Sequence, residues 1–527
     1  MKTTNSYPSD GRNMSGLGER EGKSPGYYFD RRFFLQTCTG LGFGLLIGNS
    51  NAAGNVKIDG GVVVDKGENS AASGTQLEQN SKVIVQNDPR DEFGKSVALS
   101  SDGSTAVVGA HLDEDPNGRR AGSAYVFEGM GGSWRQQAKL TADDGDAEDR
   151  FGFDVALSAD GSTAIIGAVN DEDPNGEEAG SAYVFTESGG SWDQQTKLDA
   201  DEGDPGDDFG SAVAVAGDGS TVIVGADGDD DPNGNFAGSA YVFAQSDGSW
   251  QQQAKLAAED GDSEDWFGDS VALAADGSTI IVGANGDEDP NGNNAGSAYV
   301  FSHSGSRWQH HTKLVPEDGD SLDYFGDAVA LTKDGSTAVV GAPEDENPNQ
   351  DRGGSAYVFT QLDGSWQQQA KLAAEDGEME DFFGNAVAIS GNGSIAIIGA
   401  YKDEGQKGSR VGSAYVFERL DGSWRQQSKL TVDDENVGES VALAENSSTA
   451  IIGAPSSVDT LEAHGPGSAY LFNQSNDSWR LQTQFTHESD NIRTDDDSGV
   501  GFGIGGTVAA LISTGYLLKR RHEGDNE

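Results

Sequence analysis

The stretch at residues 151–198, FGFDVALSADGSTAIIGAVNDEDPNGEEAGSAYVFTESGGSWDQQTKL, decides the fold because most of the chain consists of its copies. Near copies start at Phe93, Phe209, Phe267, Phe325 and Phe383, at a spacing of 58 residues, and a shortened copy starts at Val437. Self-similarity at a fixed period predicts a repeat architecture in which each copy is one structural unit. The 527 residues therefore form mainly one array of seven units rather than several unrelated domains.

Each copy contains four strand-like segments, which in this copy are residues 155–157, 163–168, 182–185 and 192–198. Asp160-Gly161 is a tight-turn signal between the first two segments. The second and third segments are apolar on both faces, as is typical of covered strands. In the fourth, apolar and polar residues alternate, which indicates a half-exposed outer strand. The sequence thus predicts an all-β fold, a seven-bladed β-propeller of four-stranded blades at residues 81–486.

Two short motifs connect the repeat to a known family. Phe151-Gly152 and Gly167-Ala168, with the fuller Gly341-Ala342-Pro343 and Gly453-Ala454-Pro455, resemble the FG-GAP repeats of the integrin α-chain propeller. The Gly-Ser-Trp and Lys-Leu elements resemble a branch of that family found in secreted bacterial and archaeal proteins, and the whole is similar to exported surface proteins of the haloarchaeal type. The resemblance implies a seven-bladed propeller used for extracellular binding, and it identifies no ligand.

Either end of the repeat array offers an outer strand for the last blade. Residues 81–91 look like a weakened fourth strand, while residues 479–485 follow the usual Ser-Trp start of that strand. We expect the C-terminal segment to complete the seventh blade and the N-terminal segment to add to it as a latch.

The composition is strongly acidic, with 88 Asp and Glu against 34 Lys and Arg and a formal net charge of -54. Such a chain repels itself unless ions screen it, and at molar salt the screening length falls to about 3 Å. We interpret the charge as adaptation to a high-salt environment. It argues against nucleic acid as a partner, because phosphates are bound by Lys and Arg. The single cysteine, Cys38, lies in a segment expected to be removed, so we predict no disulfide.

The N-terminal residues 1–53 have the pattern of a twin-arginine export signal. Arg31 and Arg32 precede Phe-Phe-Leu, a weakly apolar run at residues 40–48 and small residues at 50–53. The alternative is a chance arginine pair before a buried helix. Residues 54–80 are small and polar, and we expect a flexible lead-in.

The C-terminal end predicts a membrane anchor. Residues 499–518 carry no charge and are followed by Lys519-Arg520-Arg521, and twenty helical residues span about 30 Å. The basic cluster places the tail at residues 519–527 in the cytoplasm and the propeller outside, beyond an acidic linker at residues 487–498. A glycine-rich soluble tail is the alternative. Gly501-Phe502-Gly503 also resembles archaeal surface-protein sorting tails, although Val500 stands where those tails have proline.

The two rims of the predicted propeller differ in charge. If the strands follow chain order, the loops between strands two and three and those between blades share one rim, and both are acidic, as at residues 113–118 and 143–149. The opposite rim carries short turns and four glycosylation sequons, at Asn392, Asn446, Asn473 and Asn476. We therefore expect the acidic rim to contact an extracellular protein or glycan.

Four of the acidic loops contain the pattern D-x-D-x-N-G, the first half of a calcium loop. The candidate Ca²⁺ ligands are Asp113, Asp115, Asn117, Asp171, Asp173, Asn175, Asp229, Asp231, Asn233, Asp287, Asp289 and Asn291. The ninth and twelfth positions of the first loop, where a calcium loop has ligands, are Ala121 and Ala124. Asp115-Pro116-Asn117-Gly118 also suits a type I turn, so both interpretations stay open. The integrin calcium loop lies between strands one and two, where this chain has only a short turn, so the family's ligands do not carry over.

The sequence contains no catalytic motif, and near-identical repeats offer no singular acid pair, so we predict a non-enzymatic protein. The alternatives are a structural envelope spacer and a polysaccharide-active hydrolase or lyase with two acids near the axis. Trp266, Tyr324 and Phe382 precede the Phe-Gly motif in three successive copies. They predict either a contact patch on the acidic rim or local packing under its loops.

Overall fold

The computed structural model describes residues 81–85, 91–114, 117–172, 174–230, 233–288, 290–304, 307–346, 352–404, 411–432, 434–455, 467–476 and 478–487. The chain divides into two compact units, Met1–Lys57 and Ile58–Glu527, and every described residue belongs to the second. The predicted export signal, lead-in, membrane segment and cytoplasmic tail lie outside the described residues. None of the described residues forms a helix that is long and apolar enough to cross a membrane.

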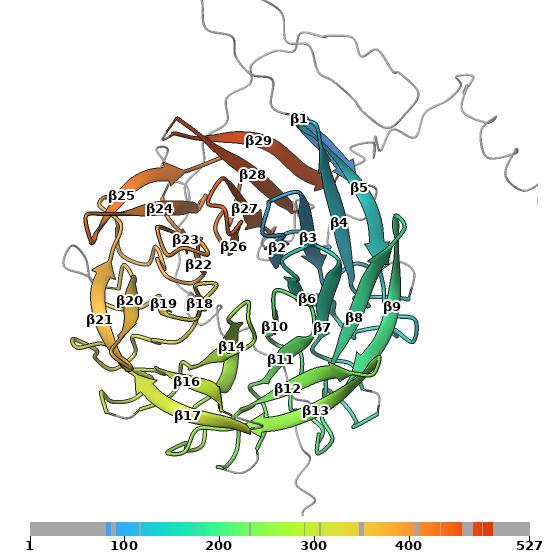
Figure 1. Cartoon of the computed structure of the whole chain (residues 1–527), viewed down its shortest axis with the longest axis horizontal. Helices are drawn as coiled ribbons and strands as arrows, with labels where there is room; N and C mark the ends of the chain where they lie inside the picture. The colour runs from blue at the N-terminus through green and yellow to red at the C-terminus, as the bar shows by residue number, and fades with distance from the viewer. Residues whose placement is uncertain are drawn as a thin grey trace, which may run out of the picture. The chain divides into compact units, whose positions relative to one another are not determined.

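Seven antiparallel sheets follow one another in sequence order around a common axis (Figure 1). In each sheet four strands pair in chain order, with the first strand innermost and the fourth outermost. The predicted seven-bladed propeller of four-stranded blades is therefore confirmed. The blades are, in order, β2–β5 (Val97–Leu99, Thr105–Ala110, Ser123–Met130, Ser133–Leu140), β6–β9 (Phe151–Leu157, Thr163–Ala168, Ser181–Ser188, Ser191–Leu198), β10–β13 (Val213–Val215, Thr221–Ala226, Ser239–Ser246, Ser249–Leu256), β14–β17 (Phe267–Leu273, Thr279–Ala284, Ser297–Ser304, Arg307–Leu314), β18–β21 (Val329–Leu331, Thr337–Ala342, Ser355–Leu362, Ser365–Leu372), β22–β25 (Val387–Ile389, Ile395–Ala400, Ser413–Leu420, Ser423–Leu430) and β26–β29 (Ser440–Leu443, Thr449–Ala454, Ser468–Ser475, Ser478–His487).

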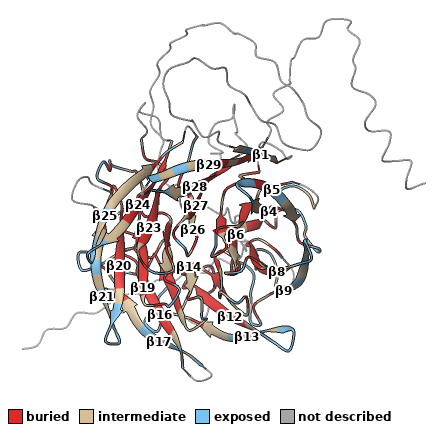
Figure 2. Cartoon of the chain, turned by 45° about the horizontal axis from the view of Figure 1, so that its top comes forward, coloured by how far each residue is buried: buried red, intermediate tan, exposed pale blue. Residues whose placement is uncertain are grey.

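The hydrophobic core lies between neighbouring blades. All six residues of β19 are buried, whereas exposed and half-buried residues alternate along most of the outer strand β21 (Figure 2). Ile165 and Val184 of the second blade pack in one cluster with Val222 and Val224 of the third. Because each sheet is covered on both faces, its middle strands have no polar face, as the sequence predicts.

The Phe-Gly and Gly-Ala motifs join one blade to the next. Phe151 packs edge-on against Phe185 of its own blade, with ring centroids 5.8 Å apart. The following Gly152 has a φ of 90°, and a Cβ added there would lie 2.3 Å from the carbonyl oxygen of Ser123 in the preceding blade. A Cβ at Gly109 would lie 2.2 Å from the carbonyl oxygen of Gly152. Both glycines are therefore required by the close approach of two backbones.

The turns between the first two strands of each blade are joined in a closed ring around the axis. The backbone N–H of Ser101 donates to the carbonyl of Ala159, and equivalent backbone bonds link each turn to the turn of the next blade. The ring closes where the backbone N–H of Asn446 donates to the carbonyl of Ser101. Inside this ring lies a cavity of about 120 Å³ lined by one aliphatic side chain per blade, namely Leu99, Leu157, Val215, Leu273, Leu331, Ile389 and Leu443. Apolar side chains thus line the cavity at this end of the axis.

Both chain ends contribute to the last blade. The C-terminal strand β29 pairs with β28 as its fourth strand, and β1 (Ser81–Val85) adds a fifth strand parallel to β29. Val85 is buried in a cluster with Phe485 of β29 and Trp134 of the first blade. The predicted C-terminal closure with an N-terminal latch is therefore confirmed, and the latch fills the junction between the last and first blades.

Candidate functional site

The acidic loops of each pair of neighbouring blades form one continuous rim, which we call the acidic rim. In the first copy it comprises the β3–β4 loop and the loop that leads from β5 to β6. The amide of Asn117 donates to the carbonyl of Ala142 at 2.9 Å, and the backbone amide of Glu148 donates to the carbonyl of Arg119 at 2.8 Å. The two loops that the sequence predicts on one rim are thus in direct contact.

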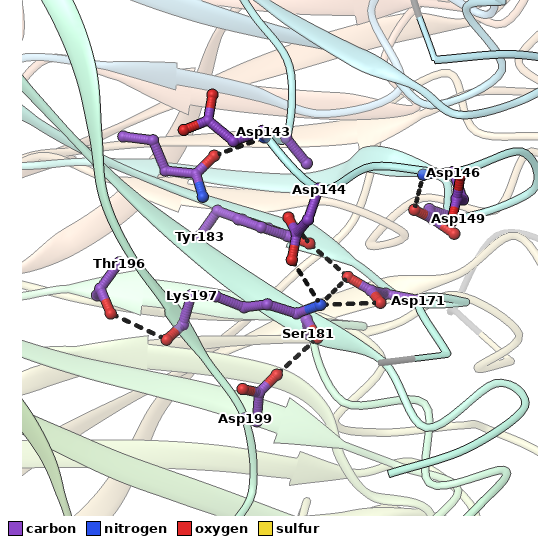
Figure 3. A network of polar contacts seen from close by, with 12 residues as sticks. Asp143, Asp144, Asp146, Asp149, Asp171, Ser181, Tyr183, Thr196, Lys197 and Asp199 are labelled. Carbon is purple, nitrogen blue, oxygen red and sulfur yellow. Dashed lines mark hydrogen bonds and ion pairs between the residues drawn. The ribbon is translucent and has the colours of Figure 1, made fainter. Parts of the chain in front are cut away.

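A buried tyrosine and aspartate and a half-buried lysine form the centre of this contact (Figure 3). The Tyr183 hydroxyl donates to Asp171 and, at 3.1 Å, to Asp144. Lys197 Nζ lies 2.9 Å from Asp171 and 3.2 Å from Asp144. Burial and the Asp171 carboxylate raise the pKa of Tyr183, so the hydroxyl remains a donor. Burial opposes the charged form of Lys197, but hydrogen bonds to Asp171 and Asp144 outweigh it and raise its pKa.

The same network recurs in the first six blades. In each, the lysine Nζ lies 2.7 to 2.9 Å from the first aspartate of the acidic loop, which also accepts a hydrogen bond from the tyrosine. In the seventh blade Gln484 replaces the lysine and donates to the Tyr470 hydroxyl at 3.0 Å. The six sets are Tyr125–Asp113–Lys139, Tyr183–Asp171–Lys197, Tyr241–Asp229–Lys255, Tyr299–Asp287–Lys313, Tyr357–Asp345–Lys371 and Tyr415–Asp403–Lys429.

These networks bear directly on the calcium candidates. The first carboxylates, Asp113, Asp171, Asp229 and Asp287, are buried and paired with lysine. Asn117, Asn175 and Asn233 donate from their amide nitrogens to backbone carbonyls of the next loop. Asn291 lies at the same place against Gly319, but its amide nitrogen makes no hydrogen bond. The second aspartates, Asp115, Asp173, Asp231 and Asp289, lie outside the described residues. Within the described part of the chain no three His, Cys, Asp or Glu side chains are grouped so that they could hold a metal. The described ligands therefore do not fit a D-x-D-x-N-G calcium cage.

Each Phe-Gly motif follows, two residues later, a second buried aspartate. The sequence motifs described above did not identify these aspartates as site residues. Asp149 accepts the backbone N–H of Asp146 at 2.6 Å, and burial, together with the nearby Asp171 carboxylate, raises its pKa to about 6. Its recurrence at a fixed place in the repeat is the sequence signal that could have revealed it. Burial raises the pKa of its counterparts to about 6 in Asp207 and Asp381 and to about 7 in Asp265 and Asp323.

Trp266, Tyr324 and Phe382 are half-buried on the acidic rim. The Trp266 ring covers Gly286, where an added Cβ would lie 2.6 Å from Trp266 Cε3. Phe382 packs against Tyr401 at 5.5 Å, and Lys402 Nζ lies 4.4 Å from its ring centroid. Local packing thus accounts for these two rings. The exposed apolar side chains of this rim are instead Phe236, Leu322 and Met379, at 46%, 37% and 59%.

The four sequons lie at the other rim. Asn392 and Asn446 are in the tight turns between first and second strands, where their side-chain oxygens accept hydrogen bonds from Ser394 and Ser448. Asn473 lies in the C-terminal half of β28, and Asn476 lies in the turn that leads from β28 to β29. Glycosylation at these residues stays a prediction.

Near-identical blades differ at several positions of the acidic rim, and we call those nearest the axis the channel mouth. Two positions of each repeat form it, the residue after the Phe-Gly motif and the residue after Gly-Ala. Asn285 joins them, because its amide nitrogen donates to Asp269 at 2.7 Å and to Asp327 of the next blade at 3.2 Å. The sequence signal was variation inside an otherwise constant repeat. The first position is occupied by Lys95, Phe153, Ser211, Asp269, Asp327, Asn385 and Glu439, and the second by His111, Val169, Asp227, Asn285, Pro343, Tyr401 and Pro455.

Comparisons with known proteins agree with this geometry. The FG-GAP repeat family matches residues 86–127, 134–185, 192–243, 250–301, 308–359 and 366–417. A comparison with curated proteins gives no match. The matched segments end in the third strand of each of the first six blades and carry the glycines at which neighbouring blades meet. With more than half of its residues matched and its motifs at the contacts between blades, the chain belongs to the FG-GAP repeat family.

Proposed function

We propose that this chain is a non-enzymatic binding or adhesion propeller that contacts an extracellular protein or glycan through its acidic rim. Binding is a general role of FG-GAP propellers. The observation that carries the proposal is the difference between the rims. The opposite rim consists of short turns, whereas the acidic rim joins longer loops and contains positions at which the blades differ.

The placement of the propeller outside the cell rests on the sequence. We propose export through Arg31 and Arg32 and anchoring by residues 499–518, with the C-terminus in the cytoplasm, in a haloarchaeal-type organism. The net charge of -54 supports a high-salt environment. Calcium has no part in this proposal, because lysine neutralises the first carboxylate of each loop in six blades.

Two other functions give different expectations. A structural envelope spacer would capture no specific partner. A polysaccharide hydrolase or lyase would need two acids unlike their counterparts in the other blades, and Asp208 beside Asp227 is such a pair. Asp208 is only 9% exposed, which leaves little access for a polymer, and a turnover assay over polysaccharides tests this alternative.

Capture from an envelope extract at high salt tests the proposed function. The immobilised chain is compared with the triple variant F236S/L322S/M379S, which removes the exposed apolar side chains of the acidic rim. The matched control is M130S/L362S/L420S, whose residues are 54%, 45% and 43% exposed at the opposite rim. We expect the first variant to lose at least tenfold in capture and the control to keep it, because contact residues at interface centres dominate affinity. Equal capture by all three proteins would exclude the acidic rim as the interface.

A further inference from the structure

The cavity inside the ring of turns lies on the propeller axis at the opposite rim. Each blade contributes the last residue of its first strand to the lining, and in every blade that residue is aliphatic. Six of these seven side chains are half-exposed, and the seventh, Ile389, is 8% exposed. Apolar surface that faces solvent gains free energy when an apolar group covers it. The repeats therefore keep an apolar wall around the axis that a ligand can cover.

The polar groups around the cavity are largely paired with one another. The backbone N–H groups of the turns donate to carbonyls of neighbouring turns all around the ring. Among the lining side chains, the Thr332 hydroxyl donates to Asp334 at 2.8 Å. A water molecule held in a cavity needs two to four polar partners. The cavity is therefore better suited to an apolar group than to ordered water.

The turn residues that line the cavity leave it open and without net charge. Five of the seven are small, namely Ser101, Ala159, Gly217, Ala275 and Gly391. The other two, Lys333 of blade five and Glu445 of blade seven, form an ion pair at 2.9 Å. Because this pair is neutral as a whole, the entrance attracts neither an anion nor a cation, and an uncharged polar group suits it best.

We propose that the axial cavity binds a short alkyl chain with one uncharged polar end, that is, a small alkanol. The volume of about 120 Å³ is comparable to that of an apolar cavity of about 150 Å³ that is known to bind benzene. The alkyl chain covers the aliphatic side chains, while the hydroxyl stays at the entrance in contact with water. High salt screens attraction between charges but does not weaken apolar burial. The site lies at the rim opposite to that of the proposed function and is independent of it.

Titration calorimetry of the full chain at constant high salt tests the proposal. The probes are 1-butanol, 1-pentanol and 1-hexanol. The control is 1,6-hexanediol, which has the length of 1-hexanol but must bury a hydroxyl without a partner. We expect saturable one-to-one binding, an affinity that rises about fourfold with each methylene, and at least tenfold weaker binding of the diol. Absence of saturable binding, an affinity that is independent of chain length, or equal binding of the diol would overturn the proposal.

Substitutions locate the site. V215F adds a ring at the smallest of the seven aliphatic positions and should weaken 1-hexanol binding at least tenfold. If V215F does not fold, A275F, which adds the same ring at the entrance, should weaken it as well. The matched control is A244F, because Ala244 is half-buried on β12 and does not line the cavity, so binding should stay unchanged. Equal affinity of the wild type, V215F and A275F would place the alkanol elsewhere and overturn the proposal.

Discussion

Lys197 shows why the role of Asp171 in the acidic rim could not be predicted from the local sequence pattern. Asp171 begins a D-x-D-x-N-G loop, which indicates a calcium ligand, yet its carboxylate binds a lysine 26 residues further along the chain. That lysine lies on the outer strand β9, and only the fold brings it back to the loop. The ammonium group supplies the positive charge for which the loop pattern suggests a metal.

The buried aspartates before the Phe-Gly motifs make stability depend on pH. Their folded-state pKa values of about 6 to 7 lie above the ordinary value near 3.8, so the folded state binds protons more readily than the unfolded chain. The free energy of unfolding should therefore rise as pH falls from 7 towards 5. Lysine lowers the pKa of Asp144, Asp260, Asp318 and Asp376, and the stability that these groups contribute is lost below about pH 4.

Urea unfolding at pH 5, 6 and 7 in constant high salt measures this dependence. The double variant D265N/D323N removes the two carboxylates with the highest of these pKa values and should flatten the slope. An unchanged slope in the variant would show that other groups cause the pH dependence.

At the scale of strands and blades, the sequence was sufficient to predict nearly the whole fold. Alternation in residues 192–198 and continuous apolar runs before them define the four strands, and the 58-residue period sets the blade number. Why these motif positions require glycine could not be predicted, because the requirement comes from contact between neighbouring blades. Gly109 and Gly152 come from neighbouring repeats, and their backbones meet only when the propeller closes.

A single methyl group tests this contact. A Cβ at Gly167 would lie 2.1 Å from the carbonyl oxygen of Gly210 in the next blade, so G167A should lower the free energy of unfolding by about 2–3 kcal/mol. Gly391 offers a matched control, because the nearest atom that an added Cβ would meet there is Cβ of Glu445 at 3.1 Å, well beyond the overlap at Gly167. G391A should change stability by less than about 1 kcal/mol in either direction. Equal effects of both substitutions in urea unfolding would show that the blades can separate to admit the methyl group.

At the scale of the whole molecule, the asymmetry of the rims could be predicted, but the channel mouth could not. Strand order alone places both acidic loops on one rim. The positions that follow Phe-Gly and Gly-Ala lie apart within each repeat and become neighbours only around the axis, as Asn285 and Asp327 do. Repeats that are nearly identical build the scaffold, and some of the positions at which they differ meet around the axis.

The net charge of the whole chain leads to a last prediction. With 88 acidic against 34 basic residues, self-repulsion should make the melting temperature rise steeply between about 0.1 M and 3 M salt, as the screening length falls from about 10 Å towards its molar-salt value of about 3 Å. At constant ionic strength Ca²⁺ and Mg²⁺ should raise it alike, because lysine already occupies the first carboxylate of each loop in six blades. Differential scanning calorimetry measures both effects. A rise with Ca²⁺ well beyond that with Mg²⁺ would show that Asp115, Asp173, Asp231 and Asp289 complete a calcium site despite the lysines.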